Sequence, residues 1–309
     1  MFRFERWILA AVAITILIAV GFSLRQHTTS DPRSLLSALP SAGATLVFAD
    51  VVALRGNGLM DLLAGPQTTG SPSIEEPDYQ RFVTETGFNY RADLDAVAAV
   101  FLGPRTYLTV RGRFRWKQLE AYATSQGGEC HSGICGLAGS TAERNISFSM
   151  MKPDVLALAV APEREAVTAI RWNGAQSTTV LPNEPIWLSV PAASLFQSSS
   201  PVKQMMMGEL KRALSGTETL LIAAGPDGNQ AVLRLEIVCD SANSAAKLAQ
   251  SLARTAIALR PVVSSVVQEP GDLAGLFAAG IFEQHAAVVT ARWPLPNKLL
   301  RALAAGSTP

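Results

Sequence analysis

Cys130, His131 and Cys135 are the residues of this sequence whose types and spacing most directly suggest chemistry. Their thiols and imidazole are metal ligands, but a structural zinc site needs four ligands, and His27 and His285 lie far away in the sequence. Four residues separate the two cysteines, which allows a disulfide across a short turn in an oxidising compartment. We favour the disulfide over unpaired thiols or a metal, and we expect no metal site.

Arg111, Arg113 and Arg115 recur at every second position after Tyr107 and Thr109. The apolar side chains between them would lie on the opposite face of a strand: Leu108, Val110, Phe114 and Trp116. Three guanidinium groups in a row could bind an anionic lipid, an anionic polymer or the carboxylates of a partner. The alternative is a solvated sheet face with acidic partners on neighbouring strands. We keep the three arginines as a candidate surface for an anionic partner.

Catalytic motifs are missing from the sequence. It contains no Gly-x-Ser-x-Gly, His-Glu-x-x-His, Walker A or Gly-x-Gly-x-x-Gly pattern in the required context, and it has only 3 histidines. Cys239 continues a run of apolar residues at every second position of a predicted strand, which places it on the apolar face. It is therefore expected to be a buried free thiol. We therefore expect a protein that is not an enzyme, has no catalytic residues and binds no cofactor.

The overall composition narrows the class of protein further. With 26 Lys+Arg against 25 Asp+Glu, the net charge is +1, which argues against a nucleic-acid partner. The chain is 48% hydrophobic and 17% charged, which excludes a mainly disordered protein. Its 309 residues are enough for a substantial core, and 3 cysteines are too few for a scaffold built from disulfides.

A membrane segment is predicted near the N-terminus. Residues 7–24 (WILAAVAITILIAVGFSL) carry no charge and, as a helix, would span roughly 27 Å of the ~30 Å hydrocarbon core. Residues 1–6 form a short tail with two arginines, and Arg25 and Arg33 follow the segment, so the positive-inside rule decides little. A six-residue tail with two arginines more often stays in the cytoplasm while the long C-terminal part is exported. We expect a single-pass protein of the bacterial inner membrane whose body is extracytoplasmic. The alternative is a cleaved signal peptide and a soluble periplasmic protein.

The remaining chain is expected to be α+β, with two similar tandem halves. Residues 25–44 are polar and contain Pro and Ser, which indicates a tether. Hairpins then alternate with helices in the same order in residues 45–175 and in residues 184–305. This order favours largely antiparallel sheet with helices on one face in each half.

The segment LPSAGATLVFADVVALR, residues 39–55, follows the predicted anchor and tether. It resembles a phrase near the start of uncharacterised bacterial membrane-anchored envelope proteins that carry tandem α+β halves. The resemblance implies the architecture and a place in the cell envelope. It implies no activity, cofactor or site residue.

These observations lead to a functional expectation. We expect a non-catalytic binding or assembly module, anchored in the membrane, whose partner is an envelope protein, polymer or lipid. One alternative is a carrier of a lipid or another apolar ligand, since the apolar content is high. The other alternative is an envelope enzyme of an unrecognised type.

Overall fold

The structure is a computed structural model that describes residues 32–59, 77–139, 141, 143–171, 181–195, 214–227, 230–265 and 278–295. The chain divides into two units, residues 1–31 and 32–309, and all the described residues belong to the second. The predicted tail (1–6) and membrane anchor (7–24) lie outside the described residues. None of the described helices combines the length and apolar character that a membrane span requires.

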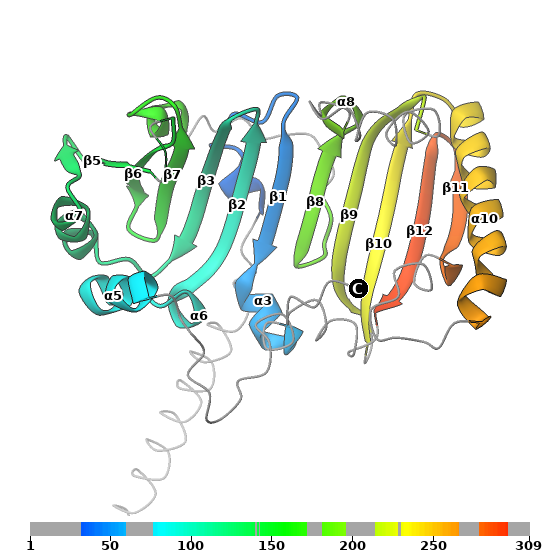
Figure 1. Cartoon of the computed structure of the whole chain (residues 1–309), viewed down its shortest axis with the longest axis horizontal. Helices are drawn as coiled ribbons and strands as arrows, with labels where there is room; N and C mark the ends of the chain where they lie inside the picture. Colours follow the sequence, from blue (N-terminus) through cyan, green and yellow to red (C-terminus); the bar gives the residue numbers. More distant parts are fainter. Residues whose placement is uncertain are drawn as a thin grey trace, which may run out of the picture. The chain divides into compact units, whose positions relative to one another are not determined.

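The described strands form one 12-stranded sheet in which every neighbouring pair is antiparallel (Figure 1). From one edge to the middle the order is β11 (Ile281–His285), β12 (Val288–Leu295), β10 (Gln230–Cys239), β9 (Thr217–Asp227) and β8 (Ile186–Pro191). It continues with β1 (Thr45–Asp50), β2 (Leu94–Leu102), β3 (Arg105–Gly112), β7 (Val155–Ala161), β6 (Asn145–Lys152), β5 (Ile134–Ala138) and β4 (Glu129–His131). The predicted α+β class with largely antiparallel sheet is confirmed.

The two strands at the middle of the sheet, β1 and β8, are the first strands of the two predicted halves. Phe48 of β1 pairs with Trp187 of β8, and their rings stack with centroids 5.8 Å apart. Both side chains are about 2% exposed, and their outer neighbours, Ala98 and Ala223, are small and buried. Small residues beside two large aromatic ones leave room for the rings to pack. The sheet is therefore continuous across the predicted boundary between the halves.

Helices lie on both faces of this sheet. Phe48 packs in a cluster with Leu35 of α2 (Pro32–Leu36) and with Val167 of a 3₁₀ helix (Ala166–Ala169). The next residue, Ala49, packs with Leu54 of α3 (Val51–Gly56), and successive residues of a strand point to opposite faces. The prediction that helices cover only one face is thus wrong, because α2 and the 3₁₀ helix occupy the face opposite α3.

The other described helices lie along the sheet, from its β4 side to its β11 edge (Figure 1). They are α5 (Pro77–Thr86), α6 (Tyr90–Asp93), α7 (Trp116–Ser125), α8 (Ala192–Leu195) and α10 (Ala242–Ser265). Leu119 and Ala123 of α7 pack on β6 and β7, while Ala245 and Leu248 of α10 pack on β10 and β12. Both helices present a buried stripe at the spacing of an amphipathic helix.

The start of the body lies earlier than the sequence predicts. The tether was expected over residues 25–44, but residues 32–44 belong to the folded body. Leu35 is 0% exposed, Leu36 and Leu39 are buried in the same cluster, and the Leu35 carbonyl accepts a hydrogen bond from the buried Thr109 hydroxyl. This segment covers β2 and β3, so its leucines contribute to the core. The tether prediction for these residues is wrong.

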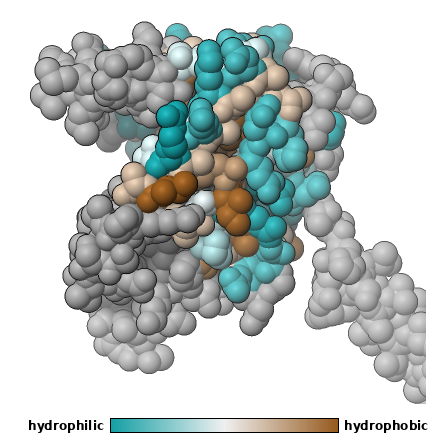
Figure 2. All heavy atoms as spheres, turned by 90° about the vertical axis from the view of Figure 1, so that its right-hand side faces the viewer, coloured by the Kyte–Doolittle hydropathy of each residue, from teal (hydrophilic) through white to brown (hydrophobic). Residues whose placement is uncertain are grey.

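Few large apolar side chains are well exposed on the side of the body that bears α10 and β11. Figure 2 shows apolar and hydrophilic surface side by side there. Ile257 of α10 and Ile281 of β11 are 60% and 66% exposed. Single exposed apolar side chains are ordinary on a protein surface. Ile257 therefore serves below as an exposed control position.

Candidate functional site

The three predicted arginines do not form a row along one strand. Arg111 lies in β3, but β3 ends at Gly112, so Arg113 follows the strand and Arg115 is the N-cap residue of α7. At Gly112 the Cα faces the carbonyl of Asp93, where an added Cβ would lie 2.4 Å from the oxygen, so only glycine fits this close approach. The prediction of three arginines in a row along one strand is wrong. The alternation of arginine with other residues continues in the sequence beyond Gly112, but the strand does not.

Acidic groups from other elements neutralise two of these arginines. Arg111 lies 3.4 Å from an Asp154 carboxylate oxygen and donates a hydrogen bond to the Ser34 hydroxyl. Arg113 lies 3.0 Å from Asp93 and 4.0 Å from Asp95. These contacts tie β3 to α2, α6, β2 and the β6–β7 turn. This arrangement corresponds to the alternative interpretation, a sheet surface with acidic partners.

Arg115 is separate from this cluster. Its guanidinium lies beside Gly87, directly after the end of α5, where an added Cβ would approach the Arg115 Nη1 to 2.9 Å. A cation at a helix C-terminus interacts favourably with the helix dipole. The candidate anionic-partner surface is thus divided between two places in the fold.

The charge cluster predicts a pH-dependent contribution to stability. Burial raises the pKa of the Asp95 carboxyl, more than the nearby guanidinium groups of Arg113, Arg55 and Arg111 lower it. Between the pKa of Asp95 in the unfolded chain and its raised pKa in the folded chain, the folded chain therefore keeps the Asp95 proton and the unfolded chain has released it. The free energy of unfolding should fall as the pH rises from about 3.9, the ordinary value for aspartate, through the raised value.

Asp95→Asn should remove this part of the pH dependence, as measured by urea unfolding of wild type and variant at a series of acidic pH values. Glu163→Gln is a control of opposite sign, because a hydrogen bond from Arg105 lowers the pKa of Glu163. The stability that Glu163 contributes is lost as the pH falls through its folded-state pKa. Identical pH profiles for wild type and Asp95→Asn would contradict the prediction.

The two cysteines lie on a hairpin at the β4 edge of the sheet. Cys130 of β4 pairs directly with Cys135 of β5, and the two form a disulfide. The hairpin turns through Ser132 and Gly133, both with positive φ (52° and 79°), as a two-residue type I′ turn requires. Cys135 is 0% exposed and packs with Leu119 and Ala123 of α7. The disulfide therefore fixes a short edge hairpin against its helix.

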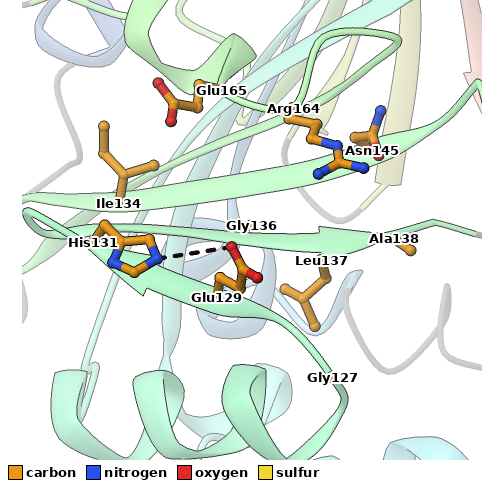
Figure 3. Close-up of a pocket in the computed structure, with 10 residues that line it drawn as sticks. All are labelled: Gly127, Glu129, His131, Ile134, Gly136, Leu137, Ala138, Asn145, Arg164 and Glu165. Carbon is orange, nitrogen blue, oxygen red and sulfur yellow. Dashed lines mark ion pairs between the residues drawn. The ribbon is translucent and has the colours of Figure 1, made fainter.

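A cavity of about 340 Å³, here called the hairpin pocket, lies beside this hairpin (Figure 3). Its lining comes from the α7–β4 turn, β4, β5, the start of β6 and the segment after β7: Gly127, Glu129, His131, Ile134, Gly136, Leu137, Ala138, Asn145, Arg164 and Glu165. Residues 162–165, called the wall segment below, carry Arg164 and Glu165 across from the Glu129 and His131 side chains of β4. Four ionisable side chains thus meet around one opening.

Other residues hold the wall segment in place. Asn145 Nδ2 donates a hydrogen bond to the Pro162 carbonyl at 2.7 Å. Arg105 donates to both carboxylate oxygens of Glu163. Immediately after the segment, the Val167 amide donates to the buried Ser147 hydroxyl at 3.0 Å. The wall segment is therefore fastened to β3 and β6 at several points.

The pocket charges themselves are largely available. Glu129 lies 3.7 Å from His131 Nε2, and the two side chains are 83% and 82% exposed. In the part of the chain that the structure describes, the side chains of Arg164 and Glu165 form no hydrogen bond or ion pair. No group of three or more His, Cys, Asp or Glu residues there could hold a metal ion. The arrangement suits recognition of a charged small molecule.

A second cavity, of about 230 Å³, lies over β9 and β10 beside residues 181–184. Two of its three charged side chains already pair within the protein: Arg234 lies 2.6 Å from Glu184, which is only 15% exposed, and Glu236 is the third. Leu181 packs in the main core cluster. This cavity is therefore a less suitable binding site than the hairpin pocket.

Sequence analysis singled out the two cysteines and His131 but missed the other pocket charges, Glu129, Arg164 and Glu165. Glu129 and His131 flank Cys130, so the disulfide hairpin was a signal for them. Arg164 and Glu165 follow Pro162 and Glu163 in a segment expected to be a helix. The structure has only a short 3₁₀ helix after that segment. No sequence pattern indicated that it would lie beside the hairpin.

Comparison with known proteins assigns no family to the chain. No family model matches the chain, and no curated protein matches it. Crystal form III of TP0453 is similar with a TM-score of 0.49 and 9% identity, over 88% of this chain and 98% of that chain. Crystal form I gives 0.47 and 10% over 91% and 98%, and crystal form IV gives 0.44 and 8% over 89% and 96%. Similarity at this level assigns no function to this chain.

Proposed function

We propose that this chain is a membrane-anchored, extracytoplasmic binding module of the bacterial cell envelope, and that the hairpin pocket is its binding site. The observation that carries the proposal is the Cys130–Cys135 disulfide, which closes the hairpin that forms one side of a pocket with available charges. Disulfides persist in oxidising compartments, which supports a body outside the cytoplasm. The apolar run at residues 7–24 supplies the expected anchor.

The lining of the pocket supports binding more than catalysis. Active sites usually exclude water from the reacting groups. Glu129 and His131 are more than four-fifths exposed, so this pocket leaves them in contact with water. Both cavities described above carry several charged groups, which favours a polar ligand over the lipid-carrier alternative.

We also propose that residues 45–175 and 184–305 are tandem versions of one α+β unit. Counted outward from the middle of the sheet, the strand order is β1-β2-β3-β7-β6 on one side and β8-β9-β10-β12-β11 on the other. A short helix follows β1 and β8, and a longer one follows β3 and β10. The β4–β5 hairpin has no counterpart among the described residues of the second half. The pocket would then be an addition to one copy of the unit.

The location is tested by protease treatment of intact spheroplasts that express the full chain with a C-terminal tag, together with thiol labelling. We expect the tag to be digested, and Cys130 and Cys135 to be labelled only after reduction. A Cys239→Ala background removes the third thiol, so that labelling reports on the pair alone. A protected tag with thiols that label without reduction would overturn the extracytoplasmic part of the proposal.

A further inference from the structure

The charged side chains that line the hairpin pocket are not the polar side chains that hold its wall segment in place. Glu163 is held by Arg105, and Asn145 by the Pro162 carbonyl. The neighbouring Arg164 and Glu165 side chains make no such contact within the described part of the chain. Arg164 lines the pocket from the wall segment, and Glu129 lines it from β4 (Figure 3). The backbone that carries these charges is fixed, and the charged side chains are available to a ligand.

We propose that the hairpin pocket binds a small ligand with one carboxylate and two ammonium groups, such as a dipeptide that contains a lysine-like diamino acid. The inference deepens the proposed function and rests on it, because it names a ligand class for the same site. The guanidinium of Arg164 can bind a carboxylate through two parallel hydrogen bonds. The carboxylates of Glu129 and Glu165 can each accept from an ammonium group.

The sum of the lining charges supports this class. Arg164 contributes one positive charge, and Glu129 and Glu165 contribute two negative charges, so the lining is net negative when His131 is neutral. An anionic ligand such as phosphate would meet two carboxylates. A ligand with a net positive charge and one carboxylate matches the signs group by group.

The size of the pocket also fits a small ligand. Its volume of about 340 Å³ lies near the lower end of the range for ligand sites, roughly 300–1,000 Å³. Gly136 on β5 leaves part of this space open, since an added Cβ would meet only the Arg164 carbonyl oxygen, at 3.8 Å. A larger side chain at residue 136 would extend into the pocket without disturbing the backbone around it.

The test is isothermal titration of the purified full chain in detergent with glycyl-L-lysine as the probe. Three analogues each lack one group: the C-terminal amide lacks the carboxylate, the N-acetyl form lacks the α-ammonium, and glycyl-L-norleucine lacks the ε-ammonium. We expect binding in the millimolar range or tighter, and each analogue to bind roughly three- to tenfold more weakly. Inorganic phosphate should not compete.

Matched variants show whether the pocket provides these contacts. In Arg164→Gln, the amide analogue should bind as well as glycyl-L-lysine, because the partner of the carboxylate is gone. In Glu129→Gln or Glu165→Gln, one of the two ammonium groups should lose its effect. Arg254→Gln and Glu283→Gln change the same charges far from the pocket and should leave the titration unchanged.

Gly136→Val adds a test of the space itself. Valine suits a strand, so the fold should be retained, as checked by the unfolding temperature and by the absence of free thiols at Cys130 and Cys135. Binding of glycyl-L-lysine should be lost in this variant. No heat signal with the wild type, or equal binding by Gly136→Val, would overturn the ligand class. Neither result bears on the spheroplast experiment, so the two proposals fail separately.

Discussion

Replacing Trp187 with alanine is expected to lower the free energy of unfolding by about 3–5 kcal/mol, as for other large buried aromatic side chains. Trp187 is 2% exposed and stacks on Phe48 across the β1–β8 pair, the only strand pair that joins the two sides of the described sheet. Its removal would leave a cavity flanked by small alanines, which cannot fill it. The measurement is urea or guanidinium unfolding of the full chain in detergent.

Two further variants separate packing from other effects of the substitution. Among the described residues the buried Trp187 indole N–H has no hydrogen-bond partner, so Trp187→Phe removes this donor and keeps most of the ring. It should cost much less than Trp187→Ala. Ile257→Ala, at a side chain that is 60% exposed, should change stability little. A loss below about 1 kcal/mol for Trp187→Ala would contradict a tightly packed centre of the sheet.

Local patterns were sufficient to predict many of the strands. The β2–β3 and β6–β7 hairpins each join two β-rich runs through a turn that contains proline, Gly103-Pro104 in one and Pro153-Asp154 in the other. The strands β4, β5 and β11 were missed. They are short and carry polar residues, and β4 and β5 are held by pairing and a disulfide, which the local hydrophobic pattern does not reveal.

Contacts between distant segments were harder to predict. The β1–β8 pair joins residues about 140 positions apart, and nothing in either strand specifies the other as its neighbour. The α2 segment looks like a tether because it contains Pro and Ser, but Leu35, Leu36 and Leu39 fill a space over β2 and β3 that the fold creates. Tertiary burial here overrides composition.

In the candidate site, too, local features could be predicted from the sequence and contacts between distant segments could not. The spacing of Cys130 and Cys135 was enough to suggest a disulfide, because both lie on one local hairpin. The prediction of an arginine row was wrong because β3 ends at Gly112 and because the partners of Arg111 and Arg113 come from α2, α6, β2 and the β6–β7 turn. The hairpin pocket needs the wall segment beside β5, a contact between segments some 30 residues apart.

Removing the disulfide is the second change with a large expected effect. A Cys130→Ala/Cys135→Ala double variant should lose about 2 kcal/mol of unfolding free energy, the amount that a cross-link closing so short a loop contributes. Loss of the buried Cys135 sulfur, which packs against Leu119 and Ala123, adds to this. The same unfolding measurement under non-reducing conditions gives the value.

Cys239→Ala is the matched control, because Cys239 is also buried but forms no disulfide. It removes one buried sulfur without breaking a cross-link, so the excess loss in the double variant reports the disulfide. A reducing agent should lower the stability of the wild type and of Cys239→Ala but leave the double variant unchanged. If reduction left the wild type equally stable, the disulfide would contribute nothing to the fold. Because the hairpin also forms one side of the pocket, reduction should weaken the binding of glycyl-L-lysine in parallel, linking the oxidising compartment to the binding function.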